Sequence, residues 1–190
     1  MEVLGHLPKN HQTKEQAVSI RVDLGPALIA RSGISAPEVE ENYTRARELC
    51  DQLGDAPTLH VLPVGNAGNI TAYWKGYEEY RAANQTTRVP RMMGFQAAGP
   101  APMVLGHVVE NPQTVATAIR IGNPASWQAA LRVIKDSSGA IDSVLDEEIL
   151  QAYTMVAGTE GVFCEPASAA SVAGVIKLSK QGALREGDTV

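Results

Sequence analysis

Short apolar runs alternate with longer helix-forming stretches along most of the chain, from about residue 58 onward. The runs that predict strands are 58–64, 91–96 and 140–145. The stretches that predict helices are 37–53, 70–82, 114–121, 124–136, 146–158 and 166–180, and a further element begins at 103–105. Because helical spans separate the strands, the pattern predicts an α/β fold: a parallel or mixed sheet with helices on both faces.

Several of these predicted helices carry signals at their ends. Pro37, Pro124 and Pro166 fall in first turns, where a missing N–H costs no hydrogen bond. Asp146-Glu147-Glu148 places carboxylates at a helix N-terminus, which the helix dipole favours. The apolar pattern is uneven before residue 45, where Gly25 and Pro26 interrupt a short apolar patch. We therefore divide the chain into an N-terminal segment, 1–45, of unknown affinity, and one domain, 46–190.

Composition narrows the functional classes. A length of 190 residues with 44% hydrophobic content is enough for a packed core. The formal net charge of −5 disfavours nucleic-acid binding, which normally shows a basic stripe. Only 5% of residues are aromatic, so no stacking platform for bases is evident. We expect no nucleic-acid partner.

The same sequence lacks the features of membrane, secreted and metal-binding proteins. No apolar run approaches the roughly 20 residues that cross a bilayer. The first residues do not follow the basic-then-apolar order of a signal peptide. Two cysteines make no disulfide framework, and four scattered histidines have no ligand spacing. We expect a cytoplasmic protein without a membrane partner or a metal site.

The turn Gly65-Asn66-Ala67-Gly68-Asn69 lies between a predicted strand and a predicted helix. This order places unpaired backbone N–H groups and the positive end of a helix dipole at one point, which suits a phosphate. Glycines allow close approach to an anion, and asparagines tolerate left-handed backbone angles and bring amide donors. The alternative is a tight strand-to-helix connection without a ligand. The glycine spacing matches neither the dinucleotide fingerprint nor the nucleoside-triphosphate loop.

Four motifs in unbroken order give the chain a family resemblance. They are VGNAGNITAYWKG from Val64, RMMGFQAAG from Arg91, AIRIGNPASW from Ala118 and EGVFCEPASAA from Glu160. With these motifs, about residues 47–190 closely resemble bacterial threonine synthases. That family belongs to the pyridoxal-phosphate enzymes of the tryptophan synthase β-subunit class.

The resemblance implies a cofactor, a reaction and site residues. In this family the Gly-Asn-Ala-Gly-Asn loop holds the cofactor phosphate, which here implies Gly65, Asn66, Ala67, Gly68 and Asn69 as the cofactor-binding residues. The implied reaction converts O-phospho-L-homoserine and water to L-threonine and phosphate, a carbon–oxygen lyase chemistry in threonine biosynthesis. The implied partner is this small-molecule substrate, and the resemblance leaves room for a homo-oligomer.

Some family motifs do not occur in this sequence. The family's Ser-Phe-Lys-Asp motif, which carries the Schiff-base lysine, is absent, as are the Gly-Asn-Thr-Ser-Ala-Ser and Thr-Gly-x-Gly-Leu-Lys-Asp segments. The chain thus resembles a fragment that lacks the N-terminal catalytic part and the C-terminal end. No catalytic residue is assigned, and Lys75 reads as a solvated helix residue rather than a replacement. We therefore expect a catalytically incomplete chain.

Two functional alternatives stay open. The chain could be a non-catalytic remnant that binds phosphate or cofactor or associates with a partner, or a serine/threonine dehydratase of the same fold.

Two single residues also have two interpretations each. Arg120 fits a substrate-phosphate partner or a surface ion pair, and Glu165 fits a neighbour of the cofactor or a helix-start carboxylate.

Overall fold

The computed structural model describes Asp51 and residues 54–190. The chain divides into two compact units, 1–55 and 56–190, and the description below concerns the second. The predicted helix over 37–53 and the domain boundary at residue 45 lie outside the described residues, apart from Asp51.

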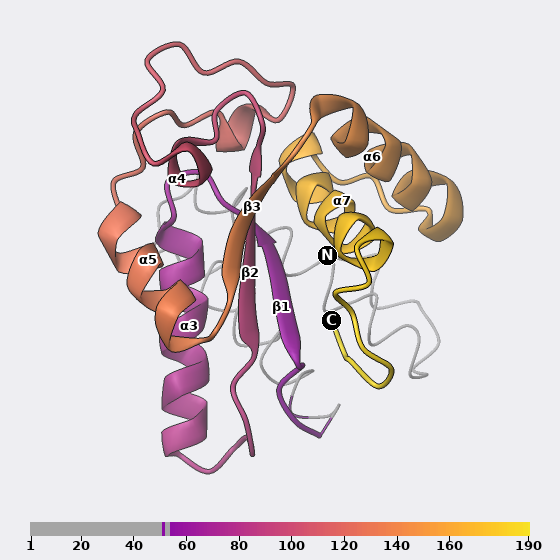
Figure 1. Ribbon diagram of the computed structural model, residues 1–190. Coiled ribbons are helices and arrows are strands. Elements are labelled where there is room, and N and C mark those ends of the chain that lie inside the picture. Colours follow the sequence, from indigo (N-terminus) through magenta and orange to yellow (C-terminus); the bar gives the residue numbers. More distant parts are fainter. Residues whose placement is uncertain (1–50, 52–53) are drawn as a thin grey trace, which may run out of the picture. The chain divides into compact units, whose positions relative to one another are not determined.

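The described unit alternates strands and helices as the sequence predicts (Figure 1). Its strands are β1 (Leu59–Pro63), β2 (Arg91–Ala97) and β3 (Ala140–Val144). Its helices are α3 (Gly68–Ala82), α4 (Pro102–Leu105), α5 (Trp127–Asp136), α6 (Asp146–Glu160) and α7 (Pro166–Lys180), with one 3-10 turn, η2 (Thr117–Ile119). The strands form one parallel sheet in the order β1-β2-β3, which confirms the predicted α/β class.

Helices cover both faces of the sheet, and β1 and β2 contribute residues to the core on each face. On one face, Met92 of β2 packs in a cluster with residues of α3 and α5. On the other, Met93 and Phe95 of β2 pack in a cluster with residues of α6 and α7. Figure 1 shows α3 and α5 on one side of the sheet and α6 and α7 on the other. This arrangement is the period-2 alternation of a strand buried on both faces.

The small residues of α7 let that helix lie directly on the sheet. A Cβ built on Gly174 would stand 2.3 Å from Cδ2 of Phe95, so no larger residue fits there without movement. Phe95 is fully buried beneath the helix. The run of alanine, serine and glycine in α7 therefore serves close packing, as in other well-filled interiors.

Two predicted helices differ from the structure. The segment 114–121 is not a helix: it holds only the 3-10 turn η2, because Thr114 and the Val115 N–H are tied to the Asp146 carboxylate of α6. The helix predicted to begin at Pro124 begins at Trp127, because the preceding N–H groups bond to the loop after β1.

The last residues of the chain return to the start of β1. Thr58 and Thr189 form mutual hydrogen bonds, and the Leu59 N–H donates to the Thr189 carbonyl at 3.0 Å. Asp188 lies 4.0 Å from the guanidinium of Arg91, and backbone and side-chain hydrogen bonds lower the pKa of its carboxyl. The end of the described chain is thereby placed beside the sheet edge.

Candidate functional site

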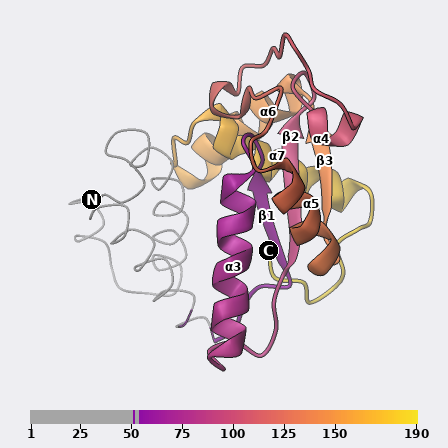
Figure 2. The same cartoon turned by 90° about the vertical axis from the view of Figure 1, so that its left-hand side faces the viewer.

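The loop from Val64 to Asn69 lies at the carboxyl end of β1 and leads directly into α3 (Figure 2). The Val64 N–H still donates to Phe95 O of β2 at 2.8 Å, so the loop departs at the end of the strand pairing. Ligands of open parallel α/β sheets bind outside the carboxyl ends of the strands. The loop therefore stands where such a fold places its site.

The backbone N–H groups of Gly65 through Asn69 donate no hydrogen bond within the described residues. Those of Gly68 and Asn69 belong to the first turn of α3, which has no earlier turn to supply acceptors. No side chain caps this helix, and no acidic residue lies in its first turn. A row of free donors at the positive end of a helix dipole favours an anion with several oxygen atoms.

The two asparagines hold the loop in shape. Asn69 donates from Nδ2 to Pro63 O at 2.6 Å and accepts the Ile70 N–H at Oδ1. Asn66 accepts the Ala125 N–H at Oδ1, at 2.7 Å, and the Ser126 N–H at its carbonyl oxygen, at 3.1 Å. Asn69 is thus engaged through both atoms of its amide, whereas Asn66 Nδ2 has no acceptor among the described residues and is a free donor in addition to the backbone N–H groups.

Ala67 carries the left-handed backbone conformation of the loop, with φ at 63°. The sequence suggested the asparagines for such angles, but their side chains are used for bracing. Gly65 has a different role: a Cβ there would lie 3.0 Å from Cα of Ile119 and 3.2 Å from the Ala118 carbonyl oxygen. The loop can pass the segment beside it only because Gly65 has no side chain.

The N-terminus of a second helix, α5, adjoins the loop. The sequence did not indicate that this helix start belongs to the site. The Ser126 N–H bonds to Asn66 O, and Ser126 Oγ lies 3.9 Å from the position of a Cβ built on Gly68. Ser126 precedes α5, and no side-chain hydrogen bond caps that helix. The signal was present as the AIRIGNPASW motif, but nothing local connects that motif to a turn 59 residues earlier.

The other candidate residues have simpler surroundings. Lys75 is 76% exposed and pairs with Glu79 at 3.7 Å, which confirms the solvated helix residue. It lies seven residues beyond Gly68, about 10 Å along the helix axis. Arg120 is exposed and forms no ion pair within the described part of the chain. Glu165 is the N-cap residue of α7, the position of a helix-start carboxylate, and its side chain makes no capping hydrogen bond.

His60 of β1 packs against α3 and stays uncharged. Its Nδ1 lies 2.9 Å from the Tyr77 hydroxyl, and its ring centroid lies 4.6 Å from that of Tyr73. Burial lowers the pKa of His60 to about 4. The imidazole is therefore neutral near pH 7 and adds no charge beneath the loop.

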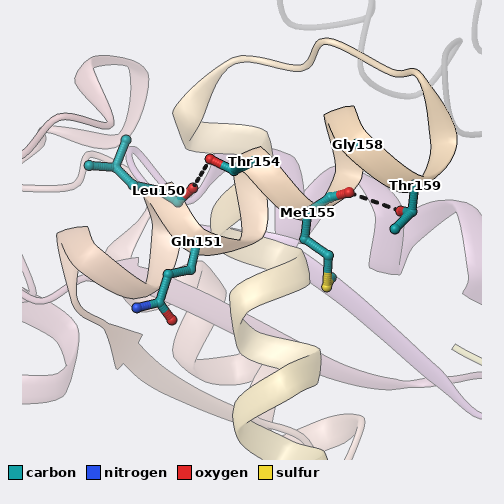
Figure 3. A pocket seen from close by; sticks show the side chains of 6 residues that line it. All are labelled: Leu150, Gln151, Thr154, Met155, Gly158 and Thr159. Carbon is teal, nitrogen blue, oxygen red and sulfur yellow. Dashed lines mark hydrogen bonds between the residues drawn. The ribbon is translucent and has the colours of Figure 1, made fainter.

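A shallow hollow of about 580 Å³ lies on the outer side of α6 (Figure 3). All its lining residues come from that one helix: Leu150, Gln151, Thr154, Met155, Gly158 and Thr159. The Thr154 and Thr159 hydroxyls donate to carbonyl oxygens of the helix itself. The hollow contains no ionisable side chain, so it offers no groups for the chemistry of a site.

Within the described residues, two further classes of site are absent. No three or more histidine, cysteine, aspartate or glutamate side chains gather closely enough there to hold a metal ion. No helix in the same part of the chain has the length and hydropathy needed to span a membrane. The loop after β1 is therefore the candidate site, with free backbone donors at a helix N-terminus among the described residues.

Comparison with known proteins identifies the family of this chain. The profile described as "Pyridoxal-phosphate dependent enzyme" matches residues 10–190. The chain belongs to this family of pyridoxal-phosphate-dependent enzymes. The match includes most of the segment 1–45, to which the sequence analysis assigned no family.

Among curated proteins, the chain is similar to threonine synthases, which confirms the resemblance. It is 53% identical over 165 residues to the threonine synthase of Mycobacterium leprae, covering 87% of this chain and 46% of that protein. It is 50% identical over 187 residues to that of Bacillus sp. strain ULM1, covering 92% and 53%. The chain thus spans about half the length of the curated relatives it matches.

Among solved structures, the fold is similar to two threonine deaminases. The crystal structure of the T.th. threonine deaminase has a TM-score of 0.57 and 19% identity, with 82% of this chain and 60% of that chain covered. Threonine deaminase isoform 2 of Solanum lycopersicum has a TM-score of 0.58 and 18% identity, with 84% and 48% covered. At this identity the likeness concerns the fold alone.

Proposed function

We propose that Gly65, Asn66, Ala67, Gly68 and Asn69 bind the phosphate group of pyridoxal phosphate. The single observation that carries the proposal is the row of free backbone N–H groups in this loop. The residues fit a phosphate dianion in three ways: free donors at a helix N-terminus, no carboxylate in the first turn, and no side chain on Gly65.

We further propose threonine synthase as the activity that this domain serves, with O-phospho-L-homoserine as substrate. Relatives of about 50% identity carry that name, and they match most of this chain. Pyridoxal phosphate, when bound, supplies an electron sink for negative charge that develops on the substrate carbon. The described residues bind and orient its phosphate end, through backbone donors that Asn66 and Asn69 hold in place.

The 190 residues alone do not, in this proposal, complete the reaction. The sequence contains no Ser-Phe-Lys-Asp motif to supply the lysine that carries the cofactor. Lys75 is solvated and paired with Glu79, and Lys177 is held by Asp142 at 2.7 Å and by the Ser143 carbonyl. A cofactor without a covalent anchor and a base for the substrate proton lacks two of the parts that catalysis needs.

The binding proposal is tested by titrating the chain with pyridoxal phosphate and following tryptophan fluorescence. Trp74 and Trp127 lie on α3 and α5, the helices that begin at the loop, so they report on this region. We expect saturable binding that Gly65→Ala weakens at least tenfold, because the added Cβ meets Ile119 and displaces the loop. Gly76→Ala, in the open middle of α3, is the matched control and keeps wild-type affinity.

Equal affinity of the two variants and wild type would contradict the loop as the phosphate site. The catalytic proposal has a separate readout, phosphate release from O-phospho-L-homoserine, for which we expect no turnover by the chain alone. Reduction of the loaded chain with borohydride, followed by peptide mapping, completes the test. Stoichiometric labelling of one lysine, such as Lys75, would overturn the proposal of an incomplete site.

A dehydratase of the same fold is the second candidate activity. It is favoured only by fold likeness at 18–19% identity to threonine deaminases, whereas threonine synthases match at about 50%. Turnover of L-threonine or L-serine to a keto acid would support the dehydratase. A cytoplasmic location and a homo-oligomer belong to the proposal as well, supported by the composition and the resemblance.

A further inference from the structure

The start of α5 holds Asn66 of the loop at two atoms. The Ala125 N–H donates to Asn66 Oδ1 at 2.7 Å, and the Ser126 N–H donates to Asn66 O at 3.1 Å. No side chain caps α5 from within its own segment, so Asn66 supplies acceptors to this helix start from 59 residues away. The helices that follow the two segments, α3 and α5, pack in one cluster on the same face of the sheet (Figure 1).

The Asn66 carbonyl belongs to the same peptide unit as the Ala67 N–H. In a planar trans peptide the C=O and the N–H point in opposite directions. While Ser126 holds the Asn66 oxygen, the Ala67 N–H is therefore turned away from the start of α5. Ala67 is 1% exposed, and its N–H has no acceptor among the described residues. Buried N–H groups without an acceptor are rare, so this one points to an acceptor that a ligand supplies.

The backbone at Ala67 needs contacts that hold it. Its φ of 63° lies in the left-handed region, which alanine seldom adopts. Such conformations persist where the surrounding structure fixes them, and they gather at ligand sites. Rotation of the peptide between Asn66 and Ala67 would break the bond to Ser126 and exchange a donor for an acceptor on the other side. The bonds from α5 oppose that rotation.

We propose that the start of α5 is a positioning element for the phosphate loop. The N–H groups of Ala125 and Ser126 hold Asn66 so that the Ala67 N–H is directed at an anion before the anion arrives. The inference rests on the proposed function, the binding of a phosphate group by Gly65–Asn69, and adds to it two residues whose N–H groups are already used by the protein. Such preorganisation raises affinity because less ordering is left to the binding step.

Ala125→Pro removes one of the two bonds with little other change. The Trp127 N–H donates to Pro124 O at 3.4 Å, so Ala125 is the second residue of a turn, where proline is favoured, and its side chain is exposed. We expect Ala125→Pro to bind pyridoxal phosphate at least fivefold more weakly in a calorimetric titration. Ala125→Ser keeps the N–H and is the matched control, with wild-type affinity.

A double-mutant cycle shows whether Ala125 acts through Asn66. Asn66→Ala removes the acceptor of the Ala125 N–H together with the free Nδ2 donor, so it weakens binding more than Ala125→Pro does. The double variant is expected to bind as Asn66→Ala does, because the Ala125 N–H has no bond left to lose. Multiplication of the two single effects would overturn the inference, and so would wild-type affinity of Ala125→Pro.

Hydrogen exchange gives a readout in the unmodified chain. A ligand on the Ala67 N–H polarises the shared peptide and strengthens the bond from Ser126 to Asn66 O in return. We expect exchange of the Ser126 amide, followed by NMR, to be at least threefold slower at saturating pyridoxal phosphate. The Ser137 amide, which donates to Val133 O at the other end of α5, is the internal control and keeps its rate.

The two proposals fail in different ways. Saturable binding of pyridoxal phosphate that leaves Ser126 exchange unchanged would overturn the positioning role of α5 and leave the proposed function standing. A wild-type chain that does not bind pyridoxal phosphate would overturn the proposed function, and the inference with it.

Discussion

Two turns of this molecule follow the same plan, a parallel strand that leads into a helix, but they treat the helix N-terminus in opposite ways. After β1, the first turn of α3 has no acidic residue and no side-chain cap, and the N–H groups of Gly65–Asn69 stay free of protein acceptors among the described residues. After β3, the first turn of α6 holds Asp146, Glu147 and Glu148.

The carboxylates of the second turn are used within the protein. Glu148 Oε2 accepts the Leu145 N–H at 2.8 Å, and Asp146 accepts the Val115 N–H at 3.0 Å and the Thr114 hydroxyl. The start of α6 thus carries carboxylates of its own chain, whereas the start of α3 carries none and can accept an external anion. The two helix starts thus differ in charge: three acidic residues lie in the first turn of α6 and none in the first turn of α3.

The largest expected difference between the two strand-to-helix regions is in how their stability depends on pH. His60 on β1 is held neutral with a pKa of about 4, and β3 contains no histidine. Below its unfolded pKa of about 6.5, this histidine binds a proton only in the unfolded chain, so the free energy of unfolding falls. We expect a loss of up to about 3 kcal/mol between pH 6.5 and pH 4.

Urea denaturation at pH 7 and pH 4.5 measures this loss. His60→Gln is expected to remove that part of the pH dependence, whereas His107→Gln at an exposed position leaves it unchanged. If His60→Gln retained the full pH dependence, burial of this imidazole would not be its cause.

Placing a carboxylate in the first turn of α3, as α6 has, is expected to abolish most anion binding. Gly68 is exposed, and a Cβ there meets nothing nearer than Ser126 Oγ at 3.9 Å, so Gly68→Asp fits the space. The carboxylate stabilises the helix start but repels a phosphate dianion, and we expect about a hundredfold weaker binding of pyridoxal phosphate. Calorimetric titration measures the affinity.

Gly68→Asn is the neutral counterpart of nearly the same shape, and it should stay within a few-fold of wild type. Equal weakening by aspartate and asparagine would show that shape rather than charge governs the loop.

Removing a carboxylate from the first turn of α6 is expected to lower the stability of the protein rather than create an anion site. Asp146→Ala removes the acceptor of the Val115 N–H and of the Thr114 hydroxyl, so we expect a loss of about 2 kcal/mol in the free energy of unfolding. Thermal or urea denaturation measures it. A variant as stable as wild type would mean that the 114–116 segment does not depend on this carboxylate.

The smallest effect is expected for Glu148→Gln. The amide oxygen still accepts the Leu145 N–H, so only the charge at the helix start is lost, worth about 0.5 kcal/mol. Pyridoxal phosphate affinity is expected to stay the same. A gain of a second binding site in this variant would show that the acidic turn competes with anions at α6.

The sequence predicts most elements of the described unit because their causes are local. The strand at 58–64, the helix at 166–180 and the acidic helix start at 146 follow from apolar runs, proline and charge within a few residues. The helix predicted at 114–121 is wrong because the Asp146 carboxylate, 32 residues away from Thr114, fixes that segment in another form.

The candidate loop was found from sequence because glycine and asparagine between a strand and a helix are a local signal. Its bracing was not, because the bonds from Asn66 to Ala125 and Ser126 join segments about 60 residues apart. The left-handed conformation of Ala67 was not predicted either, because alanine has no preference for it.

The most direct test of the account is an amide NMR titration of the chain with pyridoxal phosphate. The amides of Gly65–Asn69 have no acceptor among the described residues, and the amides at the acidic start of α6, Leu145–Glu148, serve as the internal comparison. The account predicts saturable shifts of the first group, with the second group unmoved. Saturable binding that leaves Gly65–Asn69 unshifted would contradict it.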